Sequence, residues 1–472
     1  MWTALPCSVK TEDCHVSSCV EAAGFFGDLP VVSGAARADR TAAYELHDGP
    51  TGVLKNVPGK TFEGDTLFAP TVKCTTTYLI NMRGDVVHTW ESKYPPGLYA
   101  RLLPNGNLLR AGSLPEQPVK IGGAGGIIEE IDWNGKVVWS YTMKSDNEIQ
   151  HHCFDRMPNG NTLILGWERK TPVEAQAKGR KPGTWPKEAV IKGQKTSDFW
   201  VDFVREVDRN GKTVWEWHAW DHIGTGPDQL DINYRLPESV GIDYASFDWS
   251  HFNTVEYIPA TDQVLLNSRN FSEIYLVDHK TGKIVWRWGN PSTHGKGDRP
   301  SWYDNGSQRI FGSHNATMLD NGHIQVFDNG SERAEGNRSA VVELDPKTGK
   351  EVWTYAAKYP TSFYSYRQGA AQRLPNGNTL VTSTQQGHLF EVTPAGEVVW
   401  EFVNPIMKGQ PKGIFCDATE SLPGKSATNM IHRAYRYAPD YPGLRGRDLS
   451  ATRPLVPGWP RFLDVYKPLN TK

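Results

Sequence analysis

Two turn motifs recur along this sequence, and the repetition restricts the folds that are open to the chain. In the first motif, two short strands flank an Asn-Gly turn, whose residues supply the positive φ values that a tight β-hairpin requires. A looser copy with a longer turn spans Val255–Leu266. The four tight copies have these turn glycines: Gly106, Gly160, Gly322 and Gly377. The chain is therefore a repeat protein built from β-hairpins.

The second motif is a turn followed by a strand that ends in tryptophan, as in Asp132-Trp-Asn-Gly-Lys-Val-Val-Trp139. Together the two motifs give a unit of four strands, and repeated four-stranded units are typical of the blades of a β-propeller. A tryptophan suits the gap between neighbouring blades, because no blade can bury its own faces. The six copies end at Trp90, Trp139, Trp215, Trp286, Trp353 and Trp400. We therefore predict an all-β fold, a six-bladed β-propeller with long insertions between strands.

The repeats also set the predicted domain boundaries. Residues 1–61 contain no repeated motif and are predicted to form an irregular N-terminal arm. The propeller is predicted to span residues 62–437, and residues 438–472 are predicted to form a C-terminal tail. Six tryptophan hairpins accompany only five turn hairpins, so one blade must borrow a strand from elsewhere. We expect Asn429–Tyr437 to complete that blade beside Thr66–Pro70 and to close the ring without a covalent bond.

Composition excludes several classes of function. A net charge of −2 gives no basic surface for nucleic acid, and no run of 18 apolar residues is present to form a transmembrane helix. Cys7, Cys14 and Cys19 cluster near the N-terminus, where one disulfide is expected although its pairing is open. The first residues lack the pattern of a signal peptide, so we expect either a cytosolic protein or one whose leader has been removed.

Three histidines occupy the same position in consecutive blades. His152 and His314 each precede their turn glycine by eight residues, and His251 matches them once its longer turn is allowed for. The first strand of a blade lines the central channel, so the three imidazoles are expected to meet at one end of it, within about 10 Å of one another. Packing alone gives no reason to place a costly polar group there three times. The three histidines are therefore predicted to be functional.

The residues beside these histidines receive different predictions. Strand alternation sends His151 and Cys153 to the face opposite His152, so both are expected to point away from the channel. In the blade that follows the third histidine, the equivalent position is Gly369. The ring of histidines is thus incomplete.

Four more polar residues are candidates for contact with a substrate. Arg333 and Arg338 follow the hairpin of His314, and they would form a fork for an oxyanion if they point inward. Arg367 and Gln368 directly precede the channel position of the next blade. We predict that Arg333 is catalytic and that Arg338, Arg367 and Gln368 bind substrate.

Three insertions interrupt the repeats. Residues from Glu168 to Trp200 are rich in Lys and Arg; most such stretches are solvated loops, and the alternative is a basic lid over an anion site. The other two run from His222 to Trp249 and from Asn290 to Ser313. All three are expected to crowd one mouth of the channel.

Several motifs are longer than the matches that unrelated turns would show by chance. They include His151-His-Cys-Phe-Asp-Arg-Met-Pro-Asn-Gly-Asn-Thr-Leu163, Trp249-Ser-His-Phe-Asn-Thr-Val-Glu-Tyr257 and Ile284-Val-Trp-Arg-Trp-Gly-Asn-Pro291. With these motifs the chain resembles the bacterial arylsulfotransferases over roughly residues 62–404. The studied enzymes of that family are six-bladed propellers, usually periplasmic, that move a sulfuryl group from a phenol ester to another phenol through a transient sulfated histidine.

The resemblance implies roles for individual residues. His251 and His314 correspond to histidines that contact substrate, and Arg333 to the arginine of the family. The sulfated histidine should lie in the following blade, where this chain has Arg367-Gln-Gly369 and no histidine. The resemblance thus implies a divergent arylsulfotransferase without a cofactor, periplasmic or secreted.

Two enzymatic functions follow from these predictions. In the first, the chain transfers a sulfuryl group, with His314 or His152 as nucleophile and arginines on the sulfate oxygens. In the second, His152, His251 and His314 hold a Zn, Cu or Fe ion with an open position, for hydrolysis or oxidation of a small organic substrate. A propeller that only binds a partner is less favoured, because it leaves the aligned histidines unexplained. In either enzyme the substrate is expected to be small and aromatic or anionic.

Overall fold

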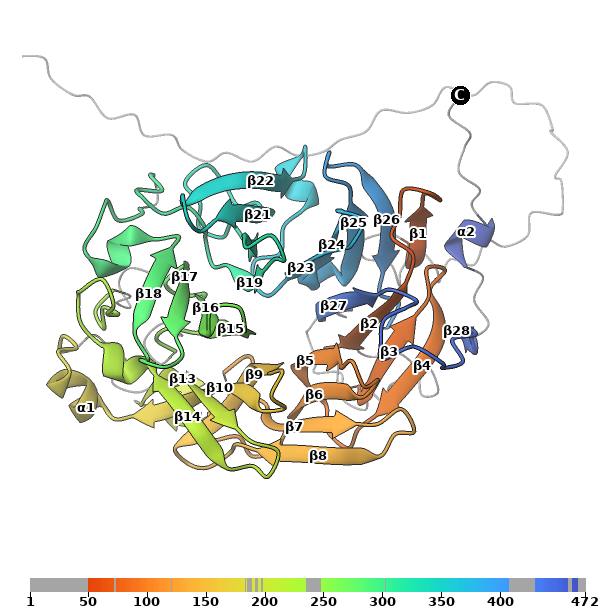
Figure 1. Ribbon diagram of the computed structural model, residues 1–472. Helices are drawn as coiled ribbons and strands as arrows, with labels where there is room; N and C mark the ends of the chain where they lie inside the picture. The colour runs from red at the N-terminus through yellow and green to blue at the C-terminus, as the bar shows by residue number, and fades with distance from the viewer. Residues whose placement is uncertain are drawn as a thin grey trace, which may run out of the picture. The chain divides into compact units, whose positions relative to one another are not determined.

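Six antiparallel sheets surround a common axis as the blades of a propeller (Figure 1). The computed structural model describes residues 50–406 and 429–465, except for gaps at 72–73, 120, 183, 185–188, 192–193, 197, 235–247, 302 and 457–460. The described residues belong to one compact unit. The predicted six-bladed, all-β architecture is confirmed.

The blades are numbered here in chain order, and their strands run from the axis outward. Blade 1 contains β27 (Ile431–Tyr437), β2 (Asp65–Pro70), β3 (Thr76–Ile80), β4 (Asp85–Glu91) and β28 (Arg453–Pro454). Blade 2 contains β5 (Pro96–Leu102), β6 (Leu108–Ser113), β7 (Gly126–Ile131) and β8 (Val137–Thr142). Blade 3 contains β9 (Glu148–Arg156), β10 (Thr162–Lys170), β13 (Phe199–Val207) and β14 (Thr213–His218).

The second half of the ring repeats the same order. Blade 4 contains β15 (Phe252–Ile258), β16 (Gln263–Ser268), β17 (Glu273–Asp278) and β18 (Ile284–Trp288). Blade 5 contains β19 (His314–Met318), β20 (Ile324–Asp328), β21 (Ala340–Asp345) and β22 (Lys350–Ala356). Blade 6 contains β23 (Ala370–Arg373), β24 (Thr379–Ser383), β25 (His388–Val392), β26 (Val398–Val403) and β1 (Gly52–Asn56).

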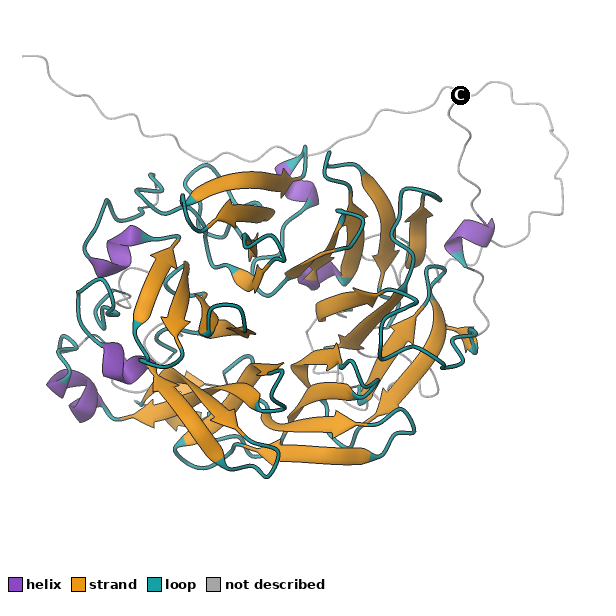
Figure 2. Cartoon of the chain, in the orientation of Figure 1, coloured by secondary structure: helices purple, strands orange, loops and turns teal. Residues whose placement is uncertain are grey.

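Helices are short and lie in the connections (Figure 2). α1 (Pro172–Ala177) begins after Thr171, whose side chain accepts a hydrogen bond from the amide of Glu174 in a capping box. The others are α2 (Phe462–Val465) and the 3-10 turns η1 (Ala219–His222), η4 (Pro291–His294), η5 (Pro360–Ser362) and η6 (Thr384–Gln386). None of the helices in the described part of the chain is long and apolar enough to cross a membrane. A separate two-stranded hairpin joins β11 (Ala189–Ile191) and β12 (Gln194–Thr196).

Tryptophans of the outer strands join several blades to the next by hydrogen bonds. The indole N–H of Trp139 in blade 2 donates to the carbonyl of Arg209 in a turn of blade 3, over 3.0 Å. In the same way Trp286 donates to Pro346, and Trp353 to Pro394. The core therefore lies between the blades, where strands such as β2 and β7 are buried on both faces.

Asn429–Tyr437 closes the ring as expected, because β27 pairs antiparallel with β2 and becomes the innermost strand of blade 1. The sheets also take in residues outside the predicted range 62–437. Gly52–Asn56 pairs with β26, and Arg453–Pro454 pairs with β4. Residues 1–49, and with them Cys7, Cys14 and Cys19, lie outside the described part of the chain.

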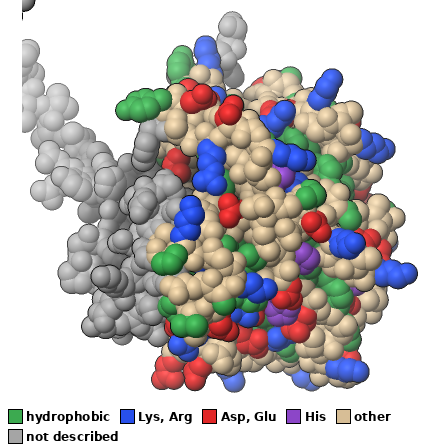
Figure 3. Space-filling model, turned by 90° about the vertical axis from the view of Figure 1, so that its left-hand side faces the viewer, with side chains coloured by type: hydrophobic (Ala, Val, Ile, Leu, Met, Phe, Trp, Pro, Cys, Tyr) green, Lys and Arg blue, Asp and Glu red, His purple; other side chains and the backbone are tan. Residues whose placement is uncertain are grey.

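Acidic and basic side chains are interspersed on the side of the propeller shown in Figure 3. This mixture agrees with the net charge of −2. The side shown offers no uniform basic stripe of the kind that nucleic acid requires.

Candidate functional site: a buried histidine cluster

The inner strands of blades 1 to 5 are bulged, and the bulges build the site. Residues 151–153 of β9 lie opposite Leu165 alone, because Gln150 pairs with Gly166 and Phe154 with Ile164. Comparable register shifts occur where β5 meets β6, β15 meets β16, β19 meets β20, and β27 meets β2. A bulge turns successive side chains toward one side of a strand instead of alternating them. Residues near these bulges with positive φ are Leu98, His152, His251 and Asn315.

Four histidines from three blades are close together. Ring centroids are 4.1 Å apart for His151 and His152, 4.8 Å for His151 and His251, and 6.0 Å for His152 and His251. His432 of β27 lies 5.3 Å from His152 by the same measure. One nitrogen from each of His151, His152 and His251 lies within 4.8 Å of those of the other two. The structure thus brings His152 and His251 together, and adds two histidines that had no predicted role.

The prediction that His151 points away from the channel is wrong. Its ring is fully buried, stacks on Trp167 at 3.5 Å between centroids, and lies beside His152. The bulge explains the error, because the alternation of side chains fails where three residues oppose one. Cys153 is a buried free thiol in the core, and its Sγ accepts a hydrogen bond from Arg433 at 3.6 Å.

His314 is held by hydrogen bonds at both ring nitrogens. Its Nδ1 lies 2.7 Å from Oδ1 of Asn329 and 3.0 Å from the carbonyl of Gly312, so Nδ1 is the protonated nitrogen. Its Nε2 accepts from the backbone N–H of Gln368 over 3.1 Å. The nitrogens within 4.8 Å of one another therefore belong to His151, His152 and His251, and not to the predicted metal set that included His314.

The remaining histidines have nitrogens without partners. Among the described residues, no group forms a hydrogen bond with Nε2 of His151, Nδ1 of His152 or either nitrogen of His432. These rings expose at most 2% of their surface. His251 is more open, with 13% of its side chain exposed.

Burial favours the neutral form of four of the histidines. Loss of solvent is the main reason that the pKa values of His151, His152, His314 and His432 lie well below the ordinary value, and repulsion from neighbouring cations and histidines adds to it. Neutral imidazoles have a free lone pair, so they can act as nucleophiles or as metal ligands.

Two buried carboxylates orient the histidines. Oδ1 of Asp202 lies 3.2 Å from Nδ1 of His151, and its Oδ2 accepts from the hydroxyl of Ser250 at 2.6 Å. Asp248 forms a short hydrogen bond with Nδ1 of His251. Burial and then the nearby Asp248 carboxylate raise the pKa of Asp202 well above its usual range. In both pairs the carboxylate occupies Nδ1 and leaves Nε2 facing away from it.

Two arginines bring positive charge to the cluster. Arg433 donates to the carbonyl of Asn253 at 2.6 Å and lies over the ring of Tyr99, and it lowers the pKa values of His152 and His432. Arg269 lies in the loop after β16 and, after burial, is the largest cause of the lowered pKa of His314. Neither arginine forms an ion pair with a carboxylate of the described residues, whereas buried Arg110 pairs with Glu129 at 2.9 Å.

Arg333, predicted to be catalytic, and the three predicted substrate-binding residues are placed less uniformly. Arg333 forms a short ion pair with the buried Asp328, and Arg338 pairs with Glu335 at 3.0 Å. The Arg367 side chain is exposed and lies over Tyr366. Gln368, by contrast, contacts the cluster through its backbone N–H.

Sequence reasoning missed His432 and Arg433, although it identified the strand that carries them. The segment Asn429–Tyr437 contains no Asn-Gly turn, so its residues could not be aligned with those of the other inner strands. Its predicted place at the axis was a usable signal, because any inner strand contributes side chains to the channel.

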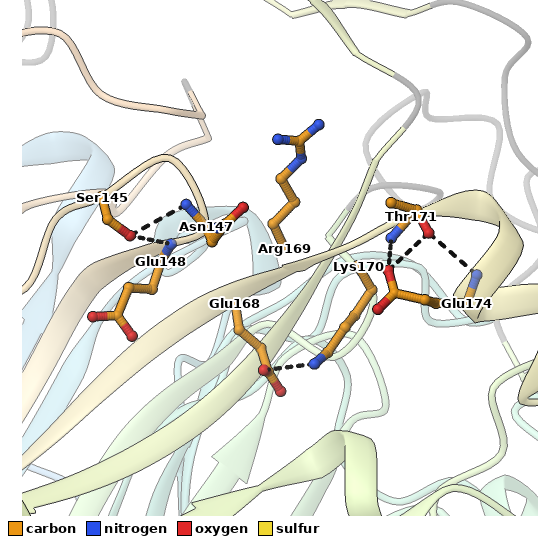
Figure 4. A pocket seen from close by; sticks show the side chains of 8 residues that line it. All are labelled: Ser145, Asn147, Glu148, Glu168, Arg169, Lys170, Thr171 and Glu174. Carbon is orange, nitrogen blue, oxygen red and sulfur yellow. Dashed lines mark hydrogen bonds and ion pairs between the residues drawn. The ribbon is translucent and has the colours of Figure 1, made fainter.

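A surface hollow of about 510 Å³ lies at the end of β10, and none of the clustered histidines lines it (Figure 4). Its charged side chains are paired: Lys170 with Glu168 at 2.8 Å, and Arg169 with Asp198 at 2.7 Å. These cations are neutralised locally, as in a solvated loop. The rest of the insertion between Glu168 and Trp200, and residues 235–247 of the next one, lie partly or wholly outside the described residues, so the predicted roof over the channel stays a prediction.

Among solved structures the similarity is remote. A protein of unknown function from Bacteroides caccae is 12% identical, with 72% of this chain and 94% of that chain covered and a TM-score of 0.43. AztD from Citrobacter koseri is 11% identical over 73% and 95%, with a TM-score of 0.35. Virginiamycin B lyase from Staphylococcus aureus is 11% identical over 76% and 75%, with a TM-score of 0.31. Such values are too low to bear on the function of this chain.

No curated protein matches the sequence. The model of one family does match, and it covers residues 184–408, from the insertion of blade 3 through blade 6. This range includes His251, His314 and Arg333, the residues that the sequence assigned by resemblance. The resemblance is thereby confirmed: over residues 184–408 this chain matches the arylsulfotransferase (ASST) family.

Proposed function

We propose that the protein transfers a sulfuryl group from an aryl sulfate to a phenolic acceptor at the histidine cluster. The family match supports this reaction class. The observation that carries the proposal is the pair Arg269 and Arg433, whose positive charges act on the buried histidines without an ion-pair partner among the described carboxylates. Buried charge of this kind favours an anion, and a sulfate ester carries its charge on oxygens that guanidinium groups bind well.

His432 is the proposed nucleophile. Both of its ring nitrogens lack a described partner, whereas Nε2 of His314 already accepts a hydrogen bond from Gln368. The unprotonated nitrogen of His432 attacks sulfur, an N–S bond forms, and the S–O bond to the phenol oxygen breaks. Arg433 and Arg269 hold the sulfuryl oxygens, where negative charge is spread in a loose transition state.

His251 is the proposed acid and base. Asp248 holds its Nδ1, which leaves Nε2 at the more exposed edge of the cluster. Protonated His251 gives its proton to the departing phenolate. It then takes the proton of the acceptor phenol, whose oxygen attacks sulfur and breaks the N–S bond, so the cycle ends with His432 and His251 as they began.

The test is turnover of 4-nitrophenyl sulfate with phenol as acceptor. His432→Ala removes the proposed nucleophile and should lower kcat by up to about 10⁶-fold. Mass spectrometry after denaturing the protein in the presence of donor alone should find a sulfuryl adduct on the peptide that contains His432. The matched control is His323→Ala, since His323 lies in the turn between β19 and β20 and pairs with Glu343, and it should keep full activity. An inactive wild-type protein, or full activity in His432→Ala, would refute the proposal.

The compartment is proposed on separate grounds. Cys74 takes part in a disulfide, and disulfides persist in oxidising compartments. Together with the usual location of the family, this supports a periplasmic or secreted protein.

A further inference from the structure

Three imidazoles of the cluster have the arrangement of ligands around one ion. His151 and His152 are neighbours in the β9 bulge, and His251 comes from the start of the next blade. One nitrogen from each lies within 4.8 Å of the other two. Nε2 of His151 and Nδ1 of His152 are buried and form no hydrogen bond with any described group. A buried nitrogen without a partner is costly, so the site is incomplete as a purely protein structure.

The groups behind these imidazoles match those found behind metal-bound histidines. Asp202 and Asp248 each face the Nδ1 atom of one histidine, which fixes the ring and directs Nε2 elsewhere. Asp202 is itself positioned by the hydroxyl of Ser250. Imidazoles oriented by carboxylates are the usual ligand environment of zinc and copper in proteins.

The buried carboxylates beside these histidines also favour a bound cation. Asp202 and Asp248 are buried, and their only ion-pair partners among the described residues are His151 and His251. Several other buried carboxylates are paired with arginine, as Glu273 is with Arg287 at 2.7 Å. In addition, Oδ1 of Asp248 has no hydrogen-bond partner in the described structure. A cation bound between the histidines would give this carboxylate oxygen an electrostatic partner.

We propose that His151, His152 and His251 bind one divalent transition-metal ion of the zinc or copper type. Tetrahedral bonds of about 2.0–2.1 Å place ligand nitrogens about 3.3–3.4 Å apart, so small rotations of the three side chains complete the site. Three protein ligands leave a fourth position for water or an oxygen of a bound molecule. The site differs from the predicted one, since His151 replaces His314. An ion on His251 would block the acid and base role proposed for that residue, so the metal-bound form and the form that transfers a sulfuryl group exclude each other.

Isothermal titration of the chelator-treated full-length protein with Zn²⁺ measures the affinity and the stoichiometry of the site. One ion should bind per chain. His151→Ala and His152→Ala should each weaken binding by more than the roughly 10–100-fold that loss of an outer partner costs. His314→Ala is the matched control, because both nitrogens of that buried ring already form hydrogen bonds, and it should bind one ion as the wild type does.

Spectroscopy of the wild type keeps the test independent of variant folding. Loading with Co²⁺ should give the intense visible absorption of a four-coordinate ion, and X-ray absorption of the zinc form should count three imidazoles. Failure of the wild type to bind one ion, fewer than three imidazoles, or undiminished binding in folded His151→Ala would overturn the proposal. Binding is read without turnover, so the result is separate from that of the 4-nitrophenyl sulfate assay.

Discussion

The half-buried imidazole of His88 is favoured as the neutral ring, and it gives a clean test of the consequence. It stacks on Trp133 at 3.8 Å between centroids, its Nε2 has no described partner, and burial lowers its pKa to about 4. Because the unfolded chain takes up this proton near pH 6.5, the contribution of His88 to the free energy of unfolding is intact above that pH. It is lost as the pH falls toward 4, with a slope below about 1.4 kcal/mol per pH unit because the ring is only partly shielded from solvent.

His88→Phe should remove this slope and leave the other titrating groups unchanged. Urea denaturation of wild type and variant between pH 4.5 and 7.5 measures it. The variant should gain stability relative to wild type as the pH falls, and two parallel curves would contradict the assignment.

The bulge of β9 depends on the chain segment before β7, where Gly123 contacts the cluster. A Cβ at Gly123, which has φ +107°, would lie 2.6 Å from Cδ2 of His152 and 2.9 Å from Cδ2 of His151. Gly123→Ala should therefore displace both rings, and metal affinity and turnover should each fall at least tenfold. Gly135→Ala is the control, because φ is +85° there but nothing lies within 4 Å. It carries backbone strain of about 1–2 kcal/mol and should leave both activities intact.

A buried ion pair joins the closing strand β27 to the neighbouring blade 6. Arg436 of β27 pairs with Glu391 of β25, both side chains are 0% exposed, and the guanidinium lies 4.3 Å from the ring centroid of Trp400. Arg436→Met leaves the buried Glu391 carboxylate without its partner and should lower the free energy of unfolding by about 3–5 kcal/mol. The double variant with Glu391→Gln should recover part of that loss in urea denaturation. Losses that simply add would show that the two side chains do not act as a pair.

The sequence predicted those parts of the molecule that repeat locally. The outer tryptophans and turn glycines recur with their hairpins, so the number of blades and the closing strand could be read directly. The bulges could not, because a bulge exists only relative to the neighbouring strand. For that reason His151 was assigned the wrong direction and His432 received no role. Arg333 illustrates a third limit, since its partner Asp328 is near in sequence but the pairing is set by the tertiary fold.

The order of synthesis delays completion of the proposed active site. His151, His152, His251 and His314 leave the ribosome with blades 3 to 5, but β27 carries His432 and Arg433 and emerges only after all six tryptophan hairpins. A nascent chain that lacks β27 has neither the proposed nucleophile nor the strand that pairs with β2. The proposed active site and the ring are therefore completed by the same strand. A chain that ends before β27 is expected to be inactive.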